Sequence, residues 1–234
     1  MERMSNRFAY HAEQIAAAQG EFIRRVFNWM GLGLATTAIV SLYAASHPSF
    51  VLTVLSSGLF WVLAIGELAL VWILSASINR LRATTAATMF FVYSALNGLT
   101  LSVIFLMYTK ASIASTFFVT AGTFGAMSLY GYTTKRDLTS WGSFLFMGLI
   151  GVVLASVVNI FFNSPTIYWL VTYAGVIVFV GLTAYDTQAI KAMALQGFDS
   201  EETRTKGAVI GALQLYLDFI NLFLMLLRIF GRRD

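Results

Sequence analysis

Residues Ala208–Phe230 read AVIGALQLYLDFINLFLMLLRIF, a run of 23 residues in which Asp218 is the one acidic side chain. About 20 mostly apolar residues suffice for a helix to cross a bilayer, so this run predicts a membrane span. Helical spacing places four small or polar residues on one stripe of this helix, namely Gly211, Gln214, Asp218 and Asn221. A polar stripe in a membrane faces protein or a wet cavity. We therefore expect the last helix to be central in the bundle, surrounded by the others.

The chain as a whole is too apolar for a water-soluble domain of its size. Of its 234 residues, 58% are hydrophobic and 11% are charged, whereas a soluble domain carries about 25% charged residues. The bilayer must therefore solvate most of the surface. The chain has no cysteine and two histidines, His11 and His47, which excludes disulfides and Cys- or His-based metal centres. The net charge of +4 is interpreted as membrane orientation, since no segment supplies the basic face that nucleic-acid binding needs.

Hydropathy along the chain predicts an all-α polytopic membrane protein with seven transmembrane helices. The predicted spans are Val26–Ala45, Gly58–Ile78, Ala86–Tyr108, Ile113–Tyr132, Gly142–Phe162, Ile167–Ile190 and Ala208–Phe230. Both prolines, Pro48 and Pro165, fall in the short breaks between spans, so no span is expected to be kinked by proline. Residues 1–25 are predicted to be a cytoplasmic N-terminal segment without a cleaved signal peptide. Residues 26–230 form the seven-helix transmembrane domain.

Basic residues fall unevenly on the two sides of the predicted membrane. Eleven of the 15 Lys and Arg residues lie in the N-terminal segment and in the second, fourth and sixth breaks. By the positive-inside rule, this places the N-terminus in the cytoplasm. Seven full spans then put the C-terminus outside, whereas its basic residues Arg228, Arg232 and Arg233 favour a re-entrant last helix that returns to the cytoplasm. The sequence leaves both topologies open.

Two intramembrane carboxylates are the candidate site. Asp186 lies near the cytoplasmic end of the sixth span, and Asp218 lies near the middle of the seventh. If the seventh helix enters the membrane near Ala212, the two side chains reach a similar depth. Two carboxylates that meet cannot both ionise at low cost, so such a pair shares a proton and titrates as a unit. When deprotonated it is a weak, hard-oxygen contact for Ca²⁺. The alternative is an Asp218 fixed by hydrogen bonds between helices, and an Asp186 that is simply near the interface.

Three further charges are candidate pore or gate residues. Glu67 lies near the middle of the second span, as a pore-lining carboxylate or as a protonated packing residue. Arg80 and Arg82 follow the same span. Their alternative roles are anchoring on the cytoplasmic side and a movable cation that pairs with Asp186. Asn221 shares the stripe of Asp218 and is added to this gate group.

Three stretches carry a resemblance to a known family. They are GYTTKRDL at Gly131–Leu138, IVFVGLTAYDTQ at Ile177–Gln188, and LYLDFINLFLMLLRIFG at Leu215–Gly231. Through them the chain resembles the bacterial branch of the Bax-inhibitor (transmembrane Bax inhibitor motif) family over nearly its whole length. The resemblance implies seven helices around a central last one. It also implies a pH-sensitive calcium leak whose proton-sensing pair corresponds to Asp186 and Asp218.

The resemblance also implies a latch, an Arg near the cytoplasmic end of the second helix that holds the aspartate pair. Glu67 fits the membrane Glu that precedes this Arg in the family. By count from Glu67 the latch position falls near Ile78, and the nearest Arg is Arg80. Two residues correspond to about 200° around a helix, so this chain departs from the family pattern there.

The sequence thus predicts a pH-sensitive calcium leak channel of the bacterial inner membrane, gated by a proton-sharing aspartate pair. Its expected partners are the lipid bilayer, H⁺ and transient Ca²⁺, with no other cofactor. The alternative is a regulatory protein that acts through a partner such as a membrane-anchored protease, as the resemblance also implies. A third reading, a proton-coupled transporter, lacks a dedicated polar pocket in the sequence. No enzyme is expected, because no nucleophile–base pair or protease motif is found.

Overall fold

The computed structural model describes residues 2–232, which are helical apart from short connections. The helices are α1 (Glu2–Ala45), α2 (Pro48–Ser56), α3 (Leu59–Ser77), α4 (Ala83–Leu101), α5 (Ile104–Met107), α6 (Lys110–Thr133), α7 (Thr139–Phe162), α8 (Pro165–Leu195) and α9 (Glu201–Phe230). Together these helices form seven spans that are long and apolar enough to cross a membrane. The prediction of an all-α, seven-helix membrane protein is therefore confirmed.

Some element boundaries differ from those predicted. The first helix is continuous from Glu2 rather than beginning at Val26, and the break after it contains the short helix α2. The third span consists of α4 and α5, joined by a turn at Ser102 and Val103. Hydropathy marks where a chain enters the apolar layer, but a helix continues beyond it wherever no residue stops it.

Prolines and polar caps set where several helices begin. Pro48 and Pro165 occupy the first turns of α2 and α8, where the N–H that proline lacks has no helical partner in any case. Three helices begin with a side-chain oxygen that accepts a backbone N–H, at Thr109, Ser164 and Ser200. Asn163 ends α7 with a φ of 48°. It turns the chain into α8, a conformation that Asn tolerates better than most residues.

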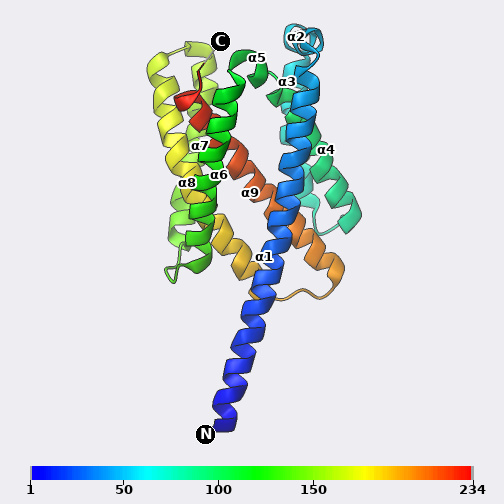
Figure 1. Cartoon of the computed structure of the whole chain (residues 1–234), viewed down its shortest axis with the longest axis vertical. Helices are drawn as coiled ribbons and strands as arrows, with labels where there is room; N and C mark the ends of the chain where they lie inside the picture. The colour runs from blue at the N-terminus through cyan, green and yellow to red at the C-terminus, as the bar shows by residue number, and fades with distance from the viewer. Residues whose placement is uncertain (1, 233–234) are drawn as a thin grey trace.

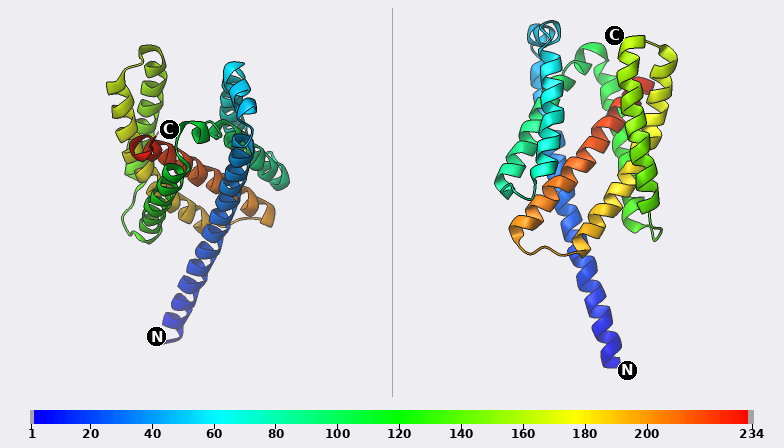
Figure 2. Two further views of the ribbon diagram at one scale, coloured as in Figure 1. Left: turned by 45° about the horizontal axis from the view of Figure 1, so that its top comes forward. Right: turned by 180° about the vertical axis from the view of Figure 1, so that it is seen from behind.

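The two ends of the chain lie at opposite ends of the bundle (Figure 1). The connections α3–α4, α6–α7 and α8–α9 lie toward the N-terminus, at what we call the N-terminal end. The connections α1–α3, α4–α6 and α7–α8 lie at the other, C-terminal end, as both views of Figure 2 also show. The described part of α9 thus crosses the bundle in full, without turning back.

The last helix is the most deeply packed of the seven. In its most apolar stretch 72% of residues are buried, against 6% in α3 and 11% in α7. It runs obliquely through the bundle (Figure 1) and packs against α1, α4, α6 and α8. The helices α3 and α7 pack mainly on helices other than α9. The position of α9 at the exact centre of the bundle, which the sequence implies, therefore stays a prediction.

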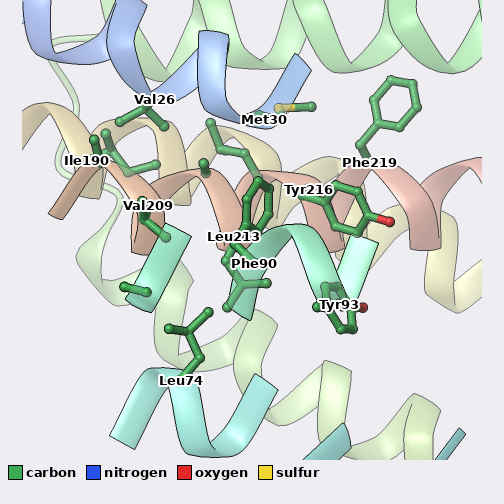
Figure 3. Close-up of a cluster of buried hydrophobic side chains, with 14 of the residues drawn as sticks. Val26, Met30, Leu74, Phe90, Tyr93, Ile190, Val209, Leu213, Tyr216 and Phe219 are labelled. Carbon is green, nitrogen blue, oxygen red and sulfur yellow. The ribbon is translucent and has the colours of Figure 1, made fainter. Parts of the chain in front are cut away.

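A core of large side chains forms where α9 meets α1, α3 and α4. Figure 3 shows Tyr216 among Phe90, Tyr93 and Leu213, with Leu74 approaching from α3. The Tyr216 ring meets Phe90 and Tyr93 edge-on, with centroids 5.8 Å and 5.6 Å apart. Such edge-to-face contacts stabilise packing beyond the area they bury. This packing fixes the rotation of α9, and so the direction in which Asp218 points.

Candidate functional site

Asp186 and Asp218 line one cavity of about 490 Å³ between α7, α8 and α9. Asp218 comes from the middle of α9 and is 4% exposed, and Asp186 comes from the last third of α8 and is half-buried. Because α8 and α9 are consecutive and antiparallel, their connection brings the two carboxyl groups to the same level. The structure therefore brings together the two carboxylates that the sequence singled out.

The two aspartate side chains line the same cavity. The Oδ2 atom of Asp218 is buried and receives no hydrogen bond from any donor that the structure describes. No lysine or arginine whose side chain is described forms an ion pair with either carboxylate. A buried carboxylate without donors or a counter-ion is costly. A proton shared by the two groups lowers this cost, since it removes one negative charge and lets one carboxyl group donate to the other.

Only part of the polar stripe predicted on the last helix lines the cavity in the structure. Gln214 and Asn221 line the cavity together with Asp218, and the Nδ2 atom of Asn221 donates to the carbonyl of Leu217 at 2.8 Å. Gly211 instead packs against Ile190 and Val26, where a Cβ would lie 3.2–3.3 Å from their side chains. Gly211 therefore serves close helix packing, and the cavity face comprises Gln214, Asp218 and Asn221.

Tyr185 separates this cavity from a second one of about 510 Å³ at the N-terminal end of the bundle. Its ring lines both cavities and lies directly on Gly142 of α7, where a Cβ would overlap the ring. The second cavity is bordered by Lys135, Arg136 and Asp137. Tyr185 thus borders both cavities, and sequence reasoning did not identify it.

Two of the three family-like stretches hold each other in place beside this cavity. Gln188 accepts from the backbone N–H of Leu138 and donates to the carbonyl of Arg136, both at 2.8 Å. Gly131 lies so close to the backbone of Ala184 that a Cβ would overlap its carbonyl. The stretches GYTTKRDL and IVFVGLTAYDTQ are therefore partners in one contact, which positions Tyr185 and Asp186.

Asp137 forms a local cap at the start of α7. Its Oδ1 atom accepts from the hydroxyl of Thr139 at 2.6 Å and from the backbone N–H of Thr139 at 2.9 Å. These hydrogen bonds, that of the hydroxyl first, hold the pKa of the Asp137 carboxyl below its ordinary value. This exposed carboxylate therefore keeps its charge at the mouth of the second cavity.

Glu67 belongs to a different polar cluster, on the opposite side of α9. Its carboxylate accepts from Asn97 Nδ2 at 3.1 Å and from the Thr100 hydroxyl at 2.9 Å. The Asn97 Oδ1 atom accepts from the Tyr216 hydroxyl at 3.0 Å, which lies 2.6 Å from the Thr37 hydroxyl. This chain of hydrogen bonds joins α3, α4, α9 and α1. Glu67 and the aspartate pair are thus separate clusters connected through α9.

Arg80 and Arg82 lie exposed in the connection between α3 and α4. Neither forms an ion pair with a described residue, so the structure does not bring them to Asp186. The start of α9 is held instead by two ion pairs with α1, Arg25–Glu201 and Arg204–Glu21. This ionic cluster was missed, because hydropathy and spacing give no information on which charged residues meet at a helix end.

The carboxylates do not form a dense metal centre. Within residues 2–232, no group of three or more Asp, Glu, His or Cys side chains is placed to hold a metal ion. Two carboxylates with the amide oxygens of Gln214 and Asn221 nearby offer hard oxygen ligands of the kind that Ca²⁺ accepts.

Comparison with known proteins gives matches over nearly the whole chain. Residues 19–234 match the family described as Inhibitor of apoptosis-promoting Bax1. The chain is 57% identical over 215 residues to the inner membrane protein YbhL of Escherichia coli, covering 91% of this chain and 92% of that protein. It is 44% identical over 216 residues to an uncharacterised protein of Borreliella burgdorferi (92% and 93% covered). It is also 38% identical over 219 residues to an uncharacterised membrane protein of Streptococcus pyogenes, with the same shares covered.

Proposed function

The chain belongs to the Bax inhibitor family, and from this premise we propose that it is a pH-sensitive calcium leak channel of the inner membrane. The proton-sharing pair Asp186 and Asp218 gates it. Its similarity to an E. coli inner membrane protein supports the location. The proposal includes no catalysis and no cofactor other than Ca²⁺ in transit, and it places the N-terminus in the cytoplasm.

The observation that carries this proposal is the approach of two carboxyl groups inside one cavity. Asp186 and Asp218 both line a cavity of about 490 Å³, and the buried Oδ2 atom of Asp218 accepts no hydrogen bond from a described group. When the two carboxyl groups share one proton, they attract each other. When that proton is lost, their two negative charges repel each other and attract a cation. Each protonation state therefore favours a different separation of α8 and α9, and the passage between these helices depends on pH.

The proposed path continues past Tyr185. This ring divides the aspartate cavity from the second cavity, whose border carries Lys135, Arg136 and Asp137. Movement of α8 relative to α7 would take the ring off Gly142 and join the two cavities. Arg80, Arg82 and Glu67 have no position on this path, and their gating role is not part of the proposal.

The test is Ca²⁺ flux into proteoliposomes between pH 5 and pH 8. We compare the wild type with Asp186→Asn and Asp218→Asn, each of which removes one titrating carboxyl while nearly keeping its shape. Asp199→Asn, at an exposed position in the α8–α9 connection, is the matched control. The expected result is a leak that changes with pH in the wild type and in the control and that is independent of pH in both pair variants.

Two results would contradict the proposal. Flux no higher than in empty liposomes at every pH would remove the channel function. A pH dependence that survives in both pair variants would leave a leak but remove the aspartate gate. Thermal unfolding in detergent, measured for each variant, distinguishes a lost gate from a lost fold.

A regulatory function through a protein partner is the second candidate, and one observation favours it. The first part of α1 extends well beyond the other helices at the N-terminal end (Figure 1). A projecting helix is accessible to a partner such as a membrane-anchored protease. If this function holds, deletion of residues 2–14 abolishes association with the partner, whereas Asp186→Asn and Asp218→Asn leave it unchanged.

A further inference from the structure

An apolar crevice lies on the face of α9 away from the aspartate pair. It encloses about 410 Å³ between α1, α5 and α6, and its floor is formed by Phe219, Ile220 and Phe223 of α9. These floor residues are at most 8% exposed, whereas Leu42 and Phe118 on the walls are 56% and 73% exposed. In Figure 1, α9 is visible passing behind the space between α1 and α6. The crevice is therefore open sideways, toward the side of the bundle that faces lipid.

A cation stands at the C-terminal end of this otherwise apolar crevice. Lys110, the first residue of α6, lines it. Arg232 is held beside it, because its N–H donates to the Ser112 hydroxyl at 3.0 Å and its carbonyl accepts from Thr109 at 3.1 Å. Neither Lys110 nor Arg232 forms an ion pair with a side chain that the structure describes. The described connections at this end contain no Asp or Glu.

We propose that this crevice binds one anionic phospholipid, with an acyl chain along α9 and the phosphate at Lys110. An apolar channel at membrane depth with a cation at one end matches a molecule that has a long apolar tail and an anionic head. The volume lies within the usual range of ligand pockets. Water has no partners along the lining of Leu, Ile and Phe side chains.

The bound lipid would also complete the packing of the bundle. It would fill the space that α1 and α6 leave over α9 and cover the buried hydroxyls of Thr37 and Ser41, which line the crevice. It would touch α9 at Phe219, one residue from Asp218. The site does not depend on the proposed channel function, and its test uses no flux measurement.

The test is native mass spectrometry of the full chain in detergent, titrated with phosphatidylglycerol and with phosphatidylcholine of the same acyl chains. The expected wild-type result is one phosphatidylglycerol adduct that survives activation, with weaker retention of phosphatidylcholine. Ala114→Trp fills the crevice and should remove the adduct. Lys110→Gln should lower the preference for phosphatidylglycerol by about fivefold, the effect of one cation near an anionic headgroup.

Two matched controls distinguish the crevice from general lipid contact. Ala69→Trp adds the same ring at an exposed position of α3, and Lys135→Gln removes a cation at the other end of the bundle. Both should retain lipid as the wild type does. The proposal is overturned if Ala114→Trp retains as much lipid as Ala69→Trp, or if the wild type retains both lipids equally. It is also overturned if Ala114→Trp converts a dimer into a monomer, because a second copy is then the occupant.

Discussion

The ring of Tyr185 on α8 lies directly on the backbone of Gly142 on α7, in a position that leaves no room for a Cβ. This contact closes the aspartate cavity toward the second cavity. It also fixes the distance between the two helices at the level of Asp186. Glycine at position 142 is therefore required by the approach of a side chain rather than by an unusual backbone angle.

The first prediction tests this contact. Gly142→Ala should lower the free energy of unfolding by about 1–3 kcal/mol, because the added methyl group overpacks a closed site. In a Tyr185→Ala background the same change should be neutral or slightly stabilising, since alanine is the better helix former. Thermal and denaturant unfolding in detergent give the four values of this double-mutant cycle.

The control for this cycle is Gly151→Ala on the same helix. A Cβ at Gly151 meets nothing within 4 Å, so this variant should unfold at or above the wild-type temperature. An additive cycle, in which Gly142→Ala costs the same with and without the Tyr185 ring, would show that the ring does not rest on Gly142.

The second prediction concerns the hydrogen bonds that link Glu67 to α9. Tyr216→Phe removes the hydroxyl that donates to Asn97 Oδ1 at 3.0 Å and lies 2.6 Å from the Thr37 hydroxyl. Asn97 then keeps a buried oxygen without its donor, which costs about 1–3 kcal/mol. Tyr130→Phe removes a hydroxyl from a ring that is 43% exposed and should change the unfolding free energy little. Equal losses in the two variants would contradict a structural role for the buried network.

The fold followed from hydropathy, because a membrane span is set by the length of an apolar run and needs no knowledge of its neighbours. Asp186 and Asp218 could be paired from the sequence because consecutive antiparallel helices bring residues on either side of a connection to the same level. The Glu67 cluster could not be foreseen, since it depends on which faces of α3, α4 and α9 meet. A contact between helices distant in the chain leaves no spacing signal. Tyr185 and Gly142 lie on consecutive helices, but their contact depends on which faces of α7 and α8 meet, and the sequence does not give this.

The third prediction is a pH dependence at the exposed cap of α7. The hydrogen bonds of Thr139 lower the pKa of Asp137 in the folded protein. The carboxylate therefore contributes stability above its unfolded pKa of about 3.9, and this contribution is lost as the pH falls through the lower folded pKa. The unfolding temperature of the wild type should exceed that of Asp137→Asn at pH 7, and the difference should shrink as the pH falls below about 3.9. A constant difference over this range would show that the charge is not involved.

The fourth prediction concerns the ionic cluster that holds the start of α9. Glu201 pairs with Arg25 of α1 and lies 3.9 Å from Arg204, which itself pairs with Glu21 at 2.8 Å. The glutamate side chains are 65% and 59% exposed, so Glu201→Gln should lower the free energy of unfolding by only about 0.2–1 kcal/mol at low salt. Because charges are screened beyond about 3 Å at 1 M salt, the difference from the wild type should shrink there.

Asp199→Asn is the matched control for this last change. Asp199 is exposed in the same connection and forms no ion pair with a described residue, so its removal should leave the unfolding temperature unchanged at either salt concentration. A loss in Glu201→Gln that persists undiminished in 1 M salt would mean that Glu201 acts through its hydrogen bond from Arg25 rather than through its charge. The position of α9 against α1 would then depend on packing and caps, and ionic strength would have no influence on it.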